Sequence, residues 1–198
     1  MPITFDTTGF QADPDGRSWS DPQTGDRIAL QVSEGPPFDA SWMSDPAALR
    51  RGFAGMFAEA GCLIQADLVP FGGAQAVWQL VKVPLPNAPS GQIFLSIFTL
   101  TKAPQYAQLI YHAPEYGTTG MREAMVMMRL GNPDSWVMPH PYDPDLKTRL
   151  PFHRGDDPAF DAQFPDHPLS RARRWAGRTA QSAQVHPQFA ALPELGSV

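Results

Sequence analysis

The sequence predicts an α+β fold, in which an antiparallel sheet built as a meander is covered by helices on both faces. Four apolar segments follow one another closely, at residues 62 to 70, 74 to 83, 92 to 101 and 106 to 113. Their short connections favour antiparallel neighbours, because parallel neighbours need long crossovers. Residues 93 to 100 are largely apolar at both odd and even positions, so the sheet needs a cover on each face.

The composition predicts one globular domain over residues 1 to 198. Apolar residues make up 42% of the chain and charged residues 18%, which is typical of packed proteins. The net charge of −5 gives no general reason to bind nucleic acid or an anionic membrane. No segment approaches the roughly 18 to 20 apolar residues of a membrane span, and MPITFDTTGF is not a secretory signal. We therefore expect a cytoplasmic protein.

The first elements expected along the chain are a hairpin and a helix. Residues 17 to 33 contain a turn rich in Asp, Pro and Gly, after which apolar and polar residues alternate from Ile28 to Val32. Ser44-Asp45-Pro46 is a helix start, and the apolar side chains that follow recur at helical spacing until Gly61. This helix, at 46 to 60, should lie on one face of the sheet.

The single cysteine, Cys62, excludes an intrachain disulfide and a cysteine-based zinc cluster. It lies where a strand begins, and we expect a buried structural thiol. The alternative role, a nucleophile, needs a base that the fold would have to bring near.

A second helix is expected at residues 121 to 130, after a turn at 115 to 120 in which a threonine can act as cap. Its apolar stripe comprises Met121, Ala124, Met125 and Met128. A methionine-rich stripe could bind copper(I) or a promiscuous ligand, although such metal sites usually recruit additional Met, Cys or His. We expect the stripe to pack on the sheet.

The C-terminal third is expected to wrap around a core formed by about residues 17 to 131. Residues 132 to 167 contain many prolines and scattered aromatic residues, without a periodic pattern. Such a segment is unusual in a compact domain, so we expect it to be functional or held down by its aromatic residues. A helix follows at 168 to 184, and the tail at 185 to 198 is expected to be loose.

The order hairpin, helix, meander, helix over residues 17 to 131 resembles the PsbP-like fold. That fold is shared by photosystem II extrinsic subunits, a nuclear-import factor that binds the Ran GTPase, and chaperones of bacterial type VI secretion. Two segments, TTGMREA at 118 to 124 and FPDHPLSRARR at 164 to 174, resemble segments of a bacterial protein family without assigned chemistry. The resemblance implies a binding or adaptor protein rather than an enzyme.

Histidines and carboxylates that could hold a divalent metal are concentrated in the C-terminal third. The candidate ligands are His140, His153, Asp156, Asp157 and His167. A metal held by such a set could activate water for hydrolysis at neutral pH. The spacings are wide, however, and no HxH or HExxH motif places two ligands on one helix face. A metal-assisted hydrolase is therefore the alternative to a binding protein, and we expect no cofactor.

Other signatures of enzymes are absent from the sequence. It contains no GxSxG elbow, P-loop or GxGxxG motif. Glu115 and Glu123 flank the start of the helix at 121 to 130, where an acid ordinarily complements the helix dipole. A general acid/base pair is the alternative role for these two residues.

The C-terminal helix carries a row of arginines on one side, at Arg171, Arg174 and Arg178. Three guanidinium groups could bind a phosphate or an acidic partner, and the alternative is ion pairs with aspartates of the same chain. At the start of this helix Pro168 fits the first position, which makes His167 the formal cap.

We expect a non-catalytic cytoplasmic binding module that acts as a chaperone or adaptor for a protein or peptide partner, for example in a bacterial secretion or toxin system. The arginine row is the candidate contact, and neither nucleic acid nor membrane is an expected partner. A third hypothesis is a small-molecule-binding domain with a pocket between the methionine-rich helix and the sheet. An exposed apolar patch would favour a protein partner, whereas a deep apolar pocket with a few polar groups would favour a small molecule.

Overall fold

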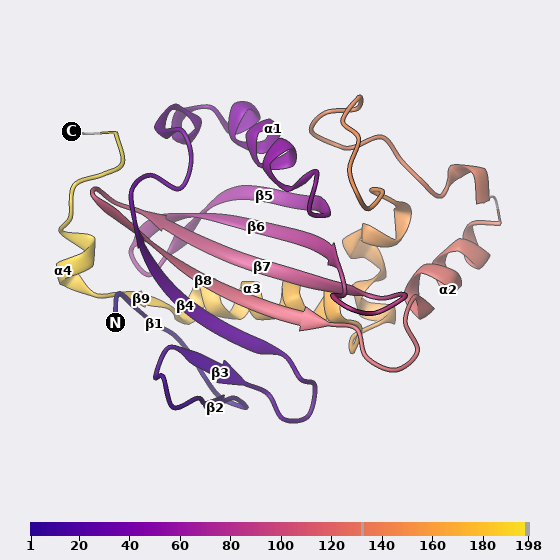
Figure 1. The fold of residues 1–198 in the computed structure, drawn as a ribbon, viewed down its shortest axis with the longest axis horizontal. Helices are drawn as coiled ribbons and strands as arrows, with labels where there is room; N and C mark the ends of the chain where they lie inside the picture. The colour runs from indigo at the N-terminus through magenta and orange to yellow at the C-terminus, as the bar shows by residue number, and fades with distance from the viewer. Residues whose placement is uncertain (132, 197–198) are drawn as a thin grey trace.

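An antiparallel sheet of seven strands forms the centre of the computed structural model, which describes residues 1–131 and 133–196 (Figure 1). The strands are β2 (Gln11–Ala12), β3 (Ser18–Ser20), β4 (Arg27–Glu34), β5 (Cys62–Phe71), β6 (Ala74–Pro84), β7 (Gln92–Thr101) and β8 (Gln105–Pro114). Their spatial order is β2-β3-β4-β8-β7-β6-β5, and all neighbours are antiparallel. The predicted meander is therefore confirmed.

The remaining elements surround this sheet. The helices are α1 (Pro46–Phe57), α2 (Met121–Leu130), α3 (Pro168–Ser182) and α4 (Pro187–Ala190). Four 3-10 helices are described, η1 (Ala40–Ser44), η2 (Pro133–Ser135), η3 (Arg154–Asp156) and η4 (Pro158–Gln163). A second small sheet pairs β1 (Ile3–Thr4) with β9 (Gln184–Val185). Within the described ranges, no helix combines the length and apolar character that crossing a bilayer requires.

The sheet is covered on both faces, as its two-sided apolar strands predict. On β6, Leu80 belongs to a core that α3 completes with Leu169, whereas the next residue, Val81, belongs to a core that α1 completes with Leu49 and Phe53. Successive side chains of a strand point to opposite faces, so one strand supplies both cores. Figure 1 shows α1 on one side of the sheet and α3 on the other. The α+β class with two covers is confirmed.

The start of α1 is confirmed, and its end lies before the predicted boundary. Asp45 caps the helix, because its side chain accepts hydrogen bonds from the amides of Ala47 at 2.9 Å and Ala48 at 3.0 Å. The helix ends at Phe57. Gly61 is required afterwards for close packing, because a Cβ atom there would lie 1.9 Å from the carbonyl oxygen of Lys82.

The position of α2 differs from the prediction. The helix has the expected bounds, but Gly120 rather than a threonine precedes it, and it lies beyond the end of the sheet against η2 and η3 (Figure 1). The exposed fractions of Met121, Met125 and Met128 are 52%, 39% and 81%. The buried residues of α2 are instead Arg122 and Val126. The prediction that the methionine stripe packs on the sheet is therefore wrong.

Part of the expected tail is held against the body. Strand β9 pairs with β1 close to the N-terminus, and Phe189 of α4 is 5% exposed in the core beneath α3. The expectation of a loose tail therefore does not hold for residues 185 to 190. Residues 197 and 198 of that tail, and residue 132 at the predicted end of α2, lie outside the described residues.

Candidate functional site

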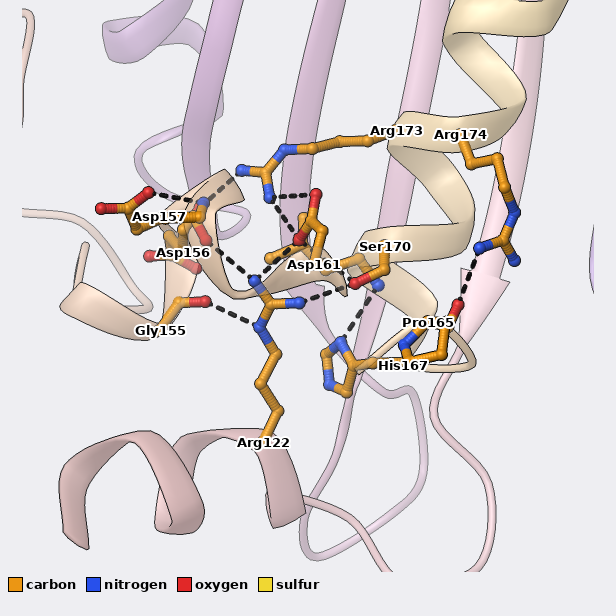
Figure 2. Close-up of polar contacts among 12 residues, drawn as sticks. Arg122, Gly155, Asp156, Asp157, Asp161, Pro165, His167, Ser170, Arg173 and Arg174 are labelled. Carbon is orange, nitrogen blue, oxygen red and sulfur yellow. Dashed lines mark hydrogen bonds and ion pairs between the residues drawn. The ribbon is translucent and has the colours of Figure 1, made fainter. Parts of the chain in front are cut away.

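A buried cluster of charged side chains joins α2, residues 133–167, which we call the wrapping segment, and α3 (Figure 2). At its centre Arg122, which is 0% exposed, points from α2 into the protein. Its guanidinium donates to the carbonyl oxygens of Gly155 at 2.9 Å and Asp157 at 3.0 Å, to Ser170 Oγ at 2.7 Å and to Asp161 Oδ1 at 2.8 Å. All three guanidinium nitrogens thus have partners, which is how a buried arginine is stabilised.

A second guanidinium, that of Arg173 on α3, meets the same acid. Its Nη1 donates to the two carboxylate oxygens of Asp161 at 3.0 and 3.1 Å, and its Nη2 donates to the carbonyl oxygen of Asp156. Asp161 is therefore shared by two arginines (Figure 2). Burial lowers the pKa of the Arg173 guanidinium. Its Nε is buried and has no hydrogen-bond partner in the part of the chain that the structure describes.

Asp156, whose backbone carbonyl accepts from Arg173, also forms a buried ion pair that joins η3 to β6. Lys82 Nζ is 2.6 Å from Asp156 Oδ2, and both side chains are 1% exposed. The same oxygen accepts a hydrogen bond from the backbone amide of His153 at 2.9 Å. The His153 ring stacks on Trp136, with their centroids 4.5 Å apart. Burial lowers the pKa of His153 to about 4, so the ring is neutral near pH 7.

We expect His153 to make the protein less stable in acid. Its pKa is about 4 in the folded state and near 6.5 in the unfolded chain, so between these values the unfolded chain binds more protons. Acidification from pH 7 to pH 4 should therefore lower the free energy of unfolding by up to about 3 kcal/mol through this residue. His153→Phe, which keeps a ring against Trp136, should remove that part of the loss. Equal losses in wild type and variant, measured by urea unfolding at both pH values, would contradict the assignment.

The structure does not bring the five candidate metal ligands together. His153 and Asp156 lie side by side, but His140 Nε2 is 3.0 Å from the carbonyl oxygen of Leu63. Asp157 caps η4, and His167 caps α3 as predicted. His140, Asp157 and His167 therefore each make a local structural hydrogen bond.

A different set of possible ligands surrounds His167. Its Nε2 and the carboxylates of Glu115 and Glu123 offer atoms within 4.8 Å of one another, and this is the one such group of three in the described ranges. His167 Nδ1 accepts the amide of Leu169 at 3.2 Å, so the neutral ring carries its proton on Nε2, 3.5 Å from Glu115 Oε1. A metal at Nε2 would have to displace that proton, and metal-bound histidines ordinarily donate from the other nitrogen. The arrangement therefore suits a histidine whose Nε2 faces Glu115 better than it suits a metal ion.

The two glutamates of this group have pKa values shifted in opposite directions. Burial alone would raise the pKa of Glu115, but the neighbouring His167 ring and hydrogen bonds from the amides of Gly120 and Gln92 lower it overall. Burial raises the pKa of Glu123. From the sequence, both glutamates were identified only as neighbours of the start of α2. Their proximity to His167 was missed, because His167 lies far away in the sequence.

The predicted arginine row is largely paired within the chain. Arg171 makes two hydrogen bonds to Asp26, at 2.8 and 2.7 Å, and its side chain is 14% exposed. Arg178 lies 3.3 Å from Asp6, and both side chains are exposed. Arg174 donates to the carbonyl oxygen of Pro165 at 3.0 Å (Figure 2). A cavity of about 240 Å³ lies beside all three arginines.

The single thiol has the structural role that we expected. Cys62 is fully buried, and burial raises its pKa to about 11. A thiol with so high a pKa is protonated at neutral pH and is a poor nucleophile.

Comparisons with known proteins find a likeness of structure only. No protein-family model matches the chain, and no curated protein matches it. Among solved structures, that of LpqN, involved in cell envelope biogenesis of Mycobacterium tuberculosis, is similar over 66% of this chain and 78% of its own. The two are 13% identical, and the TM-score is 0.37. A likeness at this level carries no functional argument.

Proposed function

We propose that this chain is a non-catalytic binding module that docks a protein partner on the exposed methionine side chains of α2. We call Met121, Met125 and Met128 the methionine face. The observation that carries the proposal is the orientation of α2, whose apolar stripe is directed to solvent while Arg122 is buried. A contiguous apolar patch on the surface of a protein is typical of an interaction site.

The methionine face is not needed to hold α2 in place. The helix is attached from its other side by the Arg122 hydrogen bonds and by the buried side chain of Val126. Methionine side chains are flexible and polarisable, so they adapt to apolar surfaces of different shape. The partner we propose is therefore a protein segment with an apolar stripe, such as an amphipathic helix.

The element order supports a chaperone or adaptor role. Hairpin, α1, meander and α2 follow one another as in the PsbP-like fold, whose members are mainly binding proteins. We propose that the module acts in the cytoplasm, with a bacterial secretion or toxin system as its setting. Arg174 and Arg178, which are exposed on α3, are proposed as contacts for acidic groups of the partner. The Arg178 pair with Asp6 is exposed and can be exchanged, whereas the Arg171 pair with Asp26 is largely buried.

Replacing the methionine face with glutamine is expected to abolish partner capture without unfolding the protein. The triple variant Met121→Gln, Met125→Gln, Met128→Gln keeps side-chain length but removes apolar surface, and exposed substitutions change stability by less than about 0.5 kcal/mol. Met56→Gln is the matched control, because Met56 on α1 is 54% exposed. The measurement is affinity purification from the source organism at native expression, quantified by mass spectrometry.

The proposal predicts a protein that the wild type and the Met56→Gln variant enrich equally and that the triple variant enriches at least about tenfold less, a loss of 1.4 kcal/mol or more. A partner enriched equally by the triple variant, or no partner at all, would refute the proposal. A captured second copy of this chain would replace the proposed partner with self-association.

A further inference from the structure

The methionine face presents three oxidisable thioether side chains on one side of α2. Met121, Met125 and Met128 are spaced by four and three residues, so they are neighbours on the surface of the helix. Their exposed fractions are 52%, 39% and 81%. The other exposed methionines, Met1 and Met56, lie at the N-terminus and on α1. The proposed docking surface is therefore also the place where exposed thioether groups are concentrated.

The thiol that would compete with these groups for an oxidant is shielded. A cysteine is oxidised readily when it is an exposed thiolate. Cys62, the single cysteine of the chain, is 0% exposed, and burial raises its pKa to about 11, so the thiol is protonated at neutral pH. Among the sulfur groups of this protein, an oxidant that arrives from solvent therefore meets the exposed thioethers first.

The attachment of α2 does not depend on the side that would be oxidised. Oxidation of a methionine that is packed in a core disrupts a protein, because it makes an apolar side chain polar. The methionine face lies on the surface, whereas Arg122 and Val126 hold the helix from its buried side. Oxidation should therefore change the surface of α2 and leave the position of the helix intact.

We propose that hydrogen peroxide regulates partner docking by oxidising the methionine face to methionine sulfoxide, which releases the partner. This inference rests on the proposed function. A sulfoxide oxygen is a hydrogen-bond acceptor, and burying it against an apolar stripe leaves it without a donor. The oxidised face is therefore a poor match for the partner that the reduced face binds.

The oxidation is a two-electron transfer of one oxygen atom. The thioether sulfur attacks one peroxide oxygen, the O–O bond breaks and an S–O bond forms. The proton of the transferred oxygen moves to the departing hydroxide, which leaves as water. Reduction by two thiols, catalysed by methionine sulfoxide reductases A and B, returns the thioether, releases the oxygen as water and joins the thiols in a disulfide. The modification is therefore reversible.

The test compares capture of one partner by reduced, oxidised and repaired protein. The full-length chain is treated with hydrogen peroxide, which catalase then removes, and is immobilised and exposed to a desalted extract of the source organism. The protein quantified is the one that the untreated wild type enriches. We expect oxidation to lower its enrichment at least about tenfold, and both reductases with dithiothreitol to restore it. The melting temperature should shift by less than about 2 °C, because the oxidised side chains are exposed.

Leucine variants show which sulfurs are responsible. The triple variant Met121→Leu, Met125→Leu, Met128→Leu keeps an apolar face that peroxide cannot oxidise, so it should capture the partner equally before and after treatment. Met56→Leu is the matched control and should lose capture on oxidation as the wild type does. If the leucine face itself weakens capture, the reductases decide, because capture by the wild type must return as mass spectrometry shows the methionine face being reduced.

The outcomes separate this inference from the proposed function. Equal capture by oxidised and reduced wild type, with no capture by the glutamine variant, would overturn the regulation and leave the docking site standing. Loss of capture by the oxidised leucine variant, a loss that the reductases do not reverse, or unfolding on oxidation would also overturn it. Full capture by the glutamine variant would refute the docking site, and the regulation with it.

Discussion

Replacing Arg122 with methionine is expected to lower the free energy of unfolding by about 3 to 5 kcal/mol. The variant leaves the carbonyl oxygens of Gly155 and Asp157 and the Ser170 hydroxyl without their donor in a buried place. Asp161 keeps Arg173 as a partner, which moderates the loss. Because these contacts attach α2 to the wrapping segment, the helix should also lose protection from amide hydrogen exchange.

The control for this variant is Arg129→Met, on the same helix. Arg129 is exposed in the last turn of α2, so its replacement should change the free energy of unfolding by less than about 0.5 kcal/mol. Urea unfolding measures both variants. If Arg122→Met were no more destabilising than Arg129→Met, the role of Arg122 as the anchor of α2 would be contradicted.

Replacing Lys82 with methionine is expected to cost a similar amount, about 3 to 5 kcal/mol, because Asp156 would remain buried without its counter-charge. The carboxylate would keep the hydrogen bond from the His153 amide at 2.9 Å, which replaces only part of what Lys82 supplies.

A second substitution should restore most of the stability. Lys82→Met with Asp156→Asn removes both charges, while the asparagine oxygen still accepts the His153 amide. Lys102→Met is the control, because Glu194 opposite Lys102 is 72% exposed and can be hydrated, so that loss should stay below about 1 kcal/mol. Thermal and urea unfolding measure all three variants. A double variant as unstable as Lys82→Met alone would show that charge burial is not the cause.

The strands and helix starts could be predicted because their signals are local. Two-sided apolar strands required two covers, and Asp45-Pro46 and His167-Pro168 mark helix starts that the structure confirms. These features depend on residues within a few positions of one another. The chain therefore specifies its α+β architecture by pattern alone.

The orientation of α2 could not be predicted from the same pattern. Its methionine stripe has the periodicity of a buried face, but the partners of Arg122 lie 33 to 48 residues further along the chain. A single fully paired arginine thus decides which side of the helix faces inward. Periodicity shows which residues lie on the same face of a helix, but it does not show which distant residues contact that face.

The candidate site was predicted only in part, for a related reason. His153 and Asp156 were identified from the sequence, but Lys82, the counter-charge of Asp156, is 74 residues away in a strand. Arg173 was missed because it does not belong to the row of arginines on one side of α3, which comprises Arg171, Arg174 and Arg178. Pairings between distant segments appear only once the fold has brought them together.

Methionine oxidation gives the most direct test of the proposed function. Dilute hydrogen peroxide is applied to the free protein and to the complex with its captured partner, and each methionine is followed by mass spectrometry. We predict that the methionine face oxidises as readily as Met56 in the free protein and is protected in the complex, where Met56 stays reactive. Slow oxidation of the methionine face in the free protein, or its unchanged oxidation in the complex, would contradict the proposal.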